Sequence, residues 1–296
     1  MMVSHFKFEV GSPACPVACK YCHVTELDAD RTAKWTNGLV GVNKACTFMN
    51  VPPWINEDRQ TSDRFYNFPW HLLKGDFAGW TAVTDGLMSD LRKYFWHWIE
   101  KVSTQSKLTT VVSKWPITNQ FMEQLAVIPD FYLVVTITGA ETIERIATKR
   151  LLANLELAQK HNVKALPMVH PYISGVSDIS FLPELKKMGY DEVCFKGLRY
   201  NPETMGSWMP SSSKLLYEGH GIEEILPEDG WRQQVKDAGL SLLSPKQWYY
   251  REAINNQPKL SESEAIANVD QLLQLAQVAS SASSDIVRRS LIERRM

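Results

Sequence analysis

The chain has 296 residues, of which 44% are hydrophobic and 22% are charged, and its formal net charge is −1. This balance is that of a globular protein, and it excludes both a disordered chain and a general attraction to polyanions. The first residues lack the apolar core of a signal peptide, and no apolar run reaches the roughly 18 residues of a membrane span. We therefore expect a cytoplasmic protein with no membrane association, folded as one large α/β barrel or as two modest domains.

The first predicted strand, His5–Val10, leads into a loop with three cysteines. Cys15, Cys19 and Cys22 lie in the stretch Cys-Pro-Val-Ala-Cys-Lys-Tyr-Cys. Three thiolates at this spacing can each bind one iron of a [4Fe–4S] cluster and leave the fourth iron without a protein ligand. An incomplete ligand set of this kind keeps one iron open for chemistry.

Other interpretations of the cysteines have less support in the sequence. A structural zinc site takes four Cys or His ligands, and His23 directly follows Cys22, so the two rarely reach one ion together. Five cysteines in the whole chain are too few, and odd in number, for a disulfide framework. Cys46 and Cys194 are interpreted as ordinary small apolar residues.

The middle of the chain alternates between β-rich runs and helical patterns. Further strands are predicted over 79–84, 108–113, 131–137, 163–169 and 192–198, with helices over 87–102 and 141–161 among the segments between them. Runs that are apolar throughout suit parallel strands buried on both faces, and units of about 30 residues are typical of βαβ crossovers. With His5–Val10 they predict an α/β fold, a partial (β/α)6 TIM-like barrel over residues 1–200. The cysteine loop then follows the carboxyl end of the first strand, where barrel active sites lie.

The composition changes after residue 200. Residues 201–230 are rich in Pro, Gly and Ser and predict a long loop over the barrel mouth. A helix is predicted over 231–240, and one or two more from 261 to the end. We therefore expect 201–296 to be a loop-rich and helical C-terminal extension that contacts substrate or a partner.

The cysteine spacing, with Tyr21 just before Cys22, resembles the signature of the radical S-adenosylmethionine (SAM) enzymes. Further stretches resemble the spore photoproduct lyase branch and its photolyase-like relatives: Thr84-Asp85, Ser113-Lys114, and the turn from His170 to Asp178. The chain departs from that branch at Ser174 and Gly86, where proline is usual. The resemblance covers roughly residues 5 to 200, and it implies that SAM binds the open iron.

Chemistry assigns roles to these positions. The expected SAM contacts are Tyr21 at the adenine, Thr84 and Asp85 at the amino group, Lys114 of the Ser113-Lys114 pair at the carboxylate, Thr136 or Thr138 at the ribose, and Met168 and His170 at the adenine or the substrate. Structural alternatives stay open: a packing ring for Tyr21, a solvated loop for Lys114 and a structural role for His170.

The resemblance also implies the reaction. The enzyme would cleave SAM reductively to a 5′-deoxyadenosyl radical that abstracts a hydrogen atom from the substrate. Relatives of the spore photoproduct lyase type return a hydrogen atom through a cysteine and tyrosines. Cys194 and Tyr200 are the candidates here, with a plain buried cysteine as the alternative for Cys194.

Three hypotheses for the substrate remain. The first is a peptide or protein, modified with the help of a separate leader-binding protein. The second is nucleic-acid lesion repair, which the balance of 32 basic and 33 acidic residues does not favour. The third is a non-catalytic scaffold that only binds the cluster and SAM. The first two require an external electron donor such as flavodoxin or ferredoxin.

Overall fold

The computed structural model describes residues 5–10, 17, 19–22, 40–42, 47–51, 77–82, 85–89, 92–103, 108–220 and 223–243. Its strands are β1 (His5–Val10), β2 (Val40–Val42), β3 (Thr47–Val51), β4 (Phe77–Ala82), β5 (Thr109–Ser113), β6 (Phe131–Ile137), β7 (Lys164–Val169), β8 (Glu192–Phe195), β9 (Leu198–Arg199), β10 (Glu224–Ile225) and β11 (Ser241–Leu242). Its helices are α3 (Arg92–Val102), α4 (Asn119–Ala126), α5 (Thr148–Lys160), α6 (Leu182–Lys187), α7 (Pro202–Met205), α8 (Ser211–Tyr217) and α9 (Trp231–Asp237). Within these ranges no helix is long and apolar enough to cross a membrane.

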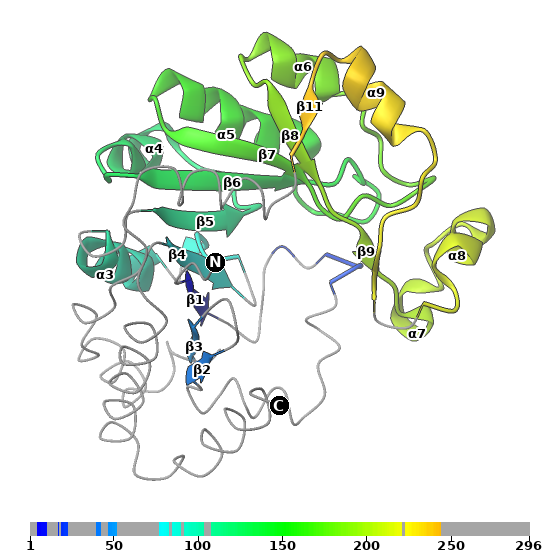
Figure 1. Ribbon diagram of the computed structural model, residues 1–296, viewed down its shortest axis with the longest axis horizontal. Helices are drawn as coiled ribbons and strands as arrows, with labels where there is room; N and C mark the ends of the chain where they lie inside the picture. Colours follow the sequence, from blue (N-terminus) through cyan, green and yellow to red (C-terminus); the bar gives the residue numbers. More distant parts are fainter. Residues whose placement is uncertain are drawn as a thin grey trace.

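Most strands belong to one curved sheet (Figure 1). Their order is β11-β8-β7-β6-β5-β4-β1-β3-β2, and only the β2–β3 pair is antiparallel. Strands β1 and β4 to β8 follow one another in the sheet as they do along the chain, which is the arrangement of successive βαβ crossovers. The predicted α/β fold with a partial barrel is confirmed, and among the described residues no pairing joins the two outer strands β2 and β11.

The two faces of the sheet are buried against different partners. In β6 every residue is buried, and successive side chains alternate between the faces. Leu133 packs outward against the helical layer, in a cluster that includes Leu151 of α5. Val134 packs inward with residues of β7 and β8 such as Leu166 and Cys194. Burial on both sides explains why these strands are apolar throughout.

Helices α3, α4, α5, α6 and α9 lie along the outer face of the sheet, whereas α7 and α8 lie away from it near β9 (Figure 1). Helix α3 turns five apolar residues to the core: Tyr94, Phe95, Trp98, Ile99 and Val102. Their spacing follows the helical repeat, so one face of the helix is apolar. The predicted helix over 231–240 is confirmed as α9.

The region 201–230 differs from the predicted long loop, since α7, α8 and β10 lie in it. The Pro and Ser residues that suggested a loop begin helices here. Asn201 caps α7 by accepting a hydrogen bond from the Glu203 amide at 2.9 Å, and Pro202 occupies the first turn. Strand β11 also extends the main sheet beside β8. The domain boundary at residue 200 stays a prediction, and the helices expected after 261 lie outside the described residues.

Candidate active site

The candidate site lies where the parallel strands end. Asp85 follows β4, Lys114 follows β5 and Thr138 follows β6, so all three belong to the carboxyl edge of the sheet. The cysteine loop meets the same edge, because the Lys20 amide donates a hydrogen bond to the carbonyl of Ile143 at 3.3 Å. The sequence-predicted residues from these segments are therefore brought together.

Two of the three predicted iron ligands are described. Cys19 and Cys22 are half-buried and belong to one turn, in which the Cys22 amide donates to the Cys19 carbonyl at 3.1 Å. Burial raises the pKa of the Cys19 thiol to about 11, and this rise is opposed by the positive charge of Lys114 and by a hydrogen bond with Tyr21. Iron binding deprotonates a coordinating thiol outright. Cys15, the third predicted ligand, lies outside the described residues.

A buried carboxylate joins the cysteine loop to two strand ends. One oxygen of Glu144 accepts hydrogen bonds from the Tyr21 hydroxyl and the Lys114 ammonium, and the other accepts from the Thr138 hydroxyl. The Lys114 ammonium also contacts the Tyr21 hydroxyl and lies 4.9 Å from the centre of its ring. The side chains of Glu144 and Lys114 are 2% and 13% exposed. Lys114 is thus a buried, paired cation, and the alternative of a solvated loop lysine is wrong.

A second carboxylate fixes the neighbouring strand ends. Asp85 accepts hydrogen bonds from the Ser113 hydroxyl at 2.7 Å, from the Leu87 amide at 3.1 Å and from the Lys114 amide. Burial raises the pKa of Asp85, and these hydrogen bonds oppose the rise. The predicted Asp85, Ser113 and Lys114 therefore form one connected unit. Thr84 lies outside the described residues.

The remaining predicted SAM contacts lie on β6 and β7. The Thr136 hydroxyl donates to the Ser113 carbonyl at 3.2 Å, so it already has a protein partner. The Thr138 hydroxyl accepts from the Ala140 amide at 3.3 Å besides donating to Glu144. Met168 is buried on the inner face of the sheet, and His170 is half-buried just past the end of β7. Their roles toward SAM stay predictions.

The two candidate hydrogen-atom donors lie in different clusters. Cys194 is fully buried on the inner face of the sheet with Met168. Burial raises the pKa of the Cys194 thiol to about 12. The positive charge of Lys196 opposes this rise, and the negative charge of Glu224 adds to it. Lys196 and Glu224 form an ion pair of 3.1 Å.

Tyr200 belongs to an apolar cluster with Tyr21, to which the half-buried Cys19 also packs. Its ring centre lies 6.0 Å from that of Tyr217, whose hydroxyl accepts from the Ser174 amide at 3.0 Å. The cluster therefore links the cysteine loop to α7 and α8. The sequence did not reveal this contact.

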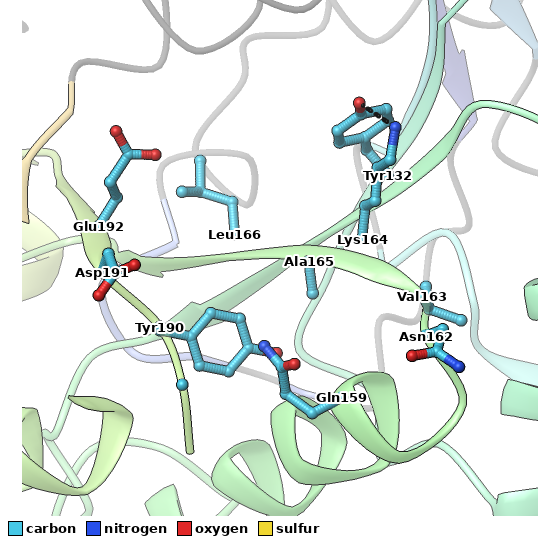
Figure 2. Close-up of a pocket in the computed structure, with 11 residues that line it drawn as sticks. Tyr132, Gln159, Asn162, Val163, Lys164, Ala165, Leu166, Tyr190, Asp191 and Glu192 are labelled. Carbon is cyan, nitrogen blue, oxygen red and sulfur yellow. Dashed lines mark hydrogen bonds between the residues drawn. The ribbon is translucent and has the colours of Figure 1, made fainter. Parts of the chain in front are cut away.

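A separate pocket of about 470 Å³ lies at the opposite end of the strands (Figure 2). Lys164 and Tyr132 stand on one side of it, joined by a hydrogen bond of 2.8 Å, and Asp191 and Glu192 stand on the other. These residues belong to the amino ends of β6, β7 and β8, or come just before them. In barrels this end contributes to stability rather than to catalysis.

Glu144 is the member of this network that sequence reasoning missed. The apolar spacing predicted a helix over 141–161, which would place Glu144 on a helix surface. Helix α5 begins only at Thr148, so Glu144 lies in the connection after β6, at the carboxyl edge. A carboxylate shortly after a strand end, as with Asp85, was the available signal.

The described residues fit an iron–sulfur cluster and SAM only in part. Two half-buried thiols share a turn, with a cation and hydroxyl groups beside them. Within the described ranges no three His, Cys, Asp or Glu side chains come together as a metal site. The predicted set needs Cys15 to complete it.

No protein-family profile matches the chain, and no curated protein matches it in sequence. Among solved structures it is similar to SuiB of Streptococcus suis (13% identity, 89% of this chain, 55% of that chain, TM-score 0.45). It is also similar to native anSMEcpe with bound AdoMet (10% identity, 81% of this chain, 64% of that chain, TM-score 0.41). A third similar structure is that of methylornithine synthase PylB (11% identity, 94% of this chain, 82% of that chain, TM-score 0.42). The chain spans about half the length of SuiB and less than two-thirds of anSMEcpe. With TM-scores below 0.5, these likenesses assign no function by themselves.

Proposed function

We propose that this chain is a radical SAM enzyme whose [4Fe–4S] cluster is held by Cys15, Cys19 and Cys22. One observation carries the proposal: the turn with Cys19 and Cys22 is hydrogen-bonded, through Tyr21, to a charged network at the carboxyl edge of a parallel α/β sheet. A plain structural loop does not require a buried lysine and a buried glutamate beside two thiols. Such groups are expensive to bury and mark functional sites.

When bound, the cluster and SAM would supply the electron transfer that generates a 5′-deoxyadenosyl radical. The chain's own groups would orient SAM and exclude water. We assign the Lys114 ammonium to the SAM carboxylate, Asp85 to the amino group, Thr138 to the ribose and the Tyr21 ring to the adenine. Lys114 is already paired with Glu144, so the SAM carboxylate would join this ion pair or replace Glu144 as the lysine's partner.

The test is an anaerobic reconstitution of the protein with iron and sulfide, followed by reduction, addition of SAM and an assay for 5′-deoxyadenosine. We expect formation that is abolished in Cys19→Ala, and no loss of the cluster in Cys194→Ala. Retained SAM cleavage in Cys19→Ala would overturn the assignment. A fully loaded, reducible cluster that yields no 5′-deoxyadenosine, even with candidate substrates, would favour the scaffold alternative. Failure to bind any cluster would favour the alternative that the cysteines bind zinc.

We propose a peptide or protein as the substrate class. Exposed leucines on α8, Leu215 and Leu216, offer apolar contact next to the cluster that contains Tyr21 and Tyr217. A leader-binding partner and a flavodoxin or ferredoxin would complete the system. Co-expression with precursor peptides should change the mass of one of them, and unchanged masses throughout would count against this substrate class.

Nucleic-acid repair is the second candidate, and the motif turn from His170 to Asp178 favours it. The charges at the described strand ends do not, because Lys114 and Lys196 are each paired with a glutamate. Repair requires an affinity for duplex DNA that falls steeply with salt. Absence of binding at low salt would remove it.

A further inference from the structure

We infer that Glu144 is a positioning residue: through the Tyr21 hydroxyl it holds the cysteine loop against the strand ends, and so determines how firmly Cys19 and Cys22 keep their metal. The inference concerns a residue that the sequence analysis did not single out. It rests on the proposed function only for the identity of the metal.

The first step is that Glu144 cannot serve as a surface residue. Its side chain is 2% exposed, and both carboxylate oxygens are engaged. A buried carboxylate persists only when charge and hydrogen bonds compensate its lost hydration. Lys114 supplies the charge, and Tyr21 and Thr138 supply two further donors. Each donor comes from a different segment, so the carboxylate joins three parts of the chain.

The second step is that Tyr21 is the only one of these donors within the cysteine loop. It stands one residue before Cys22 and two after Cys19. The loop has a parallel backbone link, since the Lys20 amide bonds the Ile143 carbonyl, one residue before Glu144. Two adjacent loop residues therefore bond two adjacent residues of the connection after β6. A pair of links of this kind fixes both the position and the orientation of the loop.

The third step is that the support behind Glu144 is rigid. Its amide, like that of Ile143, donates to the Ala140 carbonyl, at 3.1 and 3.0 Å respectively. Gly139 lies immediately before this turn with a positive φ of 66°. Ala140 and Ile143 pack in the same apolar cluster as Tyr21. Groups that orient metal ligands without touching the metal commonly change metal affinity by about 10–100-fold when they are removed.

The first measurement uses the metal-free protein, with Tyr21→Phe and Glu144→Gln as variants. Tyr21→Phe keeps the ring and removes only the hydroxyl, and Glu144→Gln keeps the shape and removes the charge. Iodoacetamide labelling is followed peptide by peptide in a mass spectrometer across pH and extrapolated to the fully ionised thiol, because Tyr21 and Glu144 also shift the Cys19 pKa. The extrapolated rate reports how often the half-buried Cys19 becomes accessible. We expect Cys19 to label about tenfold faster in either variant, since a charge-assisted hydrogen bond is lost. The fully buried Cys194 is the internal control and should keep its rate, and Glu156→Gln, on the exposed side of α5, should match the wild type.

The double variant separates this tether from general loosening. If the two groups act through one bond, Tyr21→Phe/Glu144→Gln labels no faster than the single variants. Effects that multiply, or a Cys194 rate that rises together with that of Cys19, would overturn the tether. So would single variants whose Cys19 rate equals that of the wild type.

The second measurement uses the reconstituted protein and a ferrous-iron chelator. We expect Tyr21→Phe to release iron about 10–100-fold faster than the wild type, with Glu156→Gln unchanged. The two failures are distinguishable. A wild type that binds no cluster, with Cys19 labelling still faster in the variants, removes the proposed function and leaves the tether. A stable wild-type cluster with unchanged labelling and iron release in both variants removes the tether and leaves the function.

Discussion

Asp85 and Ser113 are joined by a hydrogen bond of 2.7 Å, in which the serine hydroxyl donates to the carboxylate. The bond connects the turn after β4 with the last residue of β5. Ser113 in turn accepts from the Trp115 amide at 2.9 Å, so the backbone around Lys114 is held from both sides. The lysine side chain therefore leaves a fixed backbone toward Glu144.

The first prediction concerns Asp85→Asn. Burial holds the pKa of Asp85 above its ordinary value, so the folded state binds this proton more tightly than the unfolded chain. The contribution of the carboxyl to stability is then fully present below its unfolded pKa and is lost as pH rises through the folded one. The free energy of unfolding of the wild type minus that of Asp85→Asn should fall as pH increases from about 4. Urea unfolding across pH measures it, and a difference that grows with pH would contradict the raised pKa.

The second prediction concerns the Lys114–Glu144 ion pair. Lys114→Met leaves a buried carboxylate without its cation, and we expect the free energy of unfolding to fall by about 3–5 kcal/mol. Lys114→Met/Glu144→Met removes both charges and should recover most of that loss. Lys186→Met, at the exposed pair with Asp191, is the matched control and should cost at most about 1 kcal/mol. A double variant no more stable than Lys114→Met alone would show that packing, not the unpaired charge, is what was lost.

The sequence predicts the sheet well because its signal is local. Buried parallel strands such as β6 are continuous apolar runs, and the structure has β6 at the predicted residues. Strands β2 and β11 were missed because they are short and are the two outer strands of the sheet, where little apolar surface is needed. Strand β3 was also missed, although it pairs with β1 on one side and β2 on the other. Pro202 and Ser211 suggested a loop, although both residues also begin helices.

The candidate site was predictable only as a set of positions. Asp85, Ser113 and Lys114 stand just after or at the ends of strands, which the apolar pattern reveals. Their partners are set by tertiary contact, as with Glu144, which lies 123 residues from Tyr21. No local pattern encodes such a distant pairing.

The third prediction concerns Gly139, between Thr138 and the turn that holds Glu144. A Cβ atom there would come within 1.9 Å of the Asp178 carbonyl oxygen, and its φ is +66°. Gly139→Ala should therefore destabilise the protein by more than about 1 kcal/mol and loosen the cysteine loop. Gly189→Ala is the matched control, because its φ is also positive but no atom lies within 4 Å of the added carbon. If thermal unfolding shows the same loss of stability in Gly139→Ala and Gly189→Ala, then backbone strain alone, and not the contact with Asp178, decides the effect.

The fourth prediction concerns Cys194 as a hydrogen-atom donor. A donor must carry its hydrogen, and a thiol of ordinary pKa is protonated at neutral pH; burial raises the pKa of Cys194 further, to about 12. It packs with Met168 on the inner face of the sheet, below the strand ends where SAM is proposed to bind.

We expect Cys194→Ala to retain the cluster and 5′-deoxyadenosine formation while the yield of product per 5′-deoxyadenosine falls. Cys194→Ser has nearly the same shape but a stronger bond to hydrogen, so it should show the same uncoupling. Cys194→Ala should keep the wild-type thermal midpoint within a few degrees, since a cysteine that packs as a small apolar residue leaves little volume unfilled. Cys194→Ser places a hydroxyl in an apolar cluster and should have a lower midpoint than Cys194→Ala. The ratio of product to 5′-deoxyadenosine is the decisive quantity. If it is unchanged in both variants, Cys194 is a packing residue, and the donor role passes to Tyr200, where Tyr200→Phe tests it in the same assay.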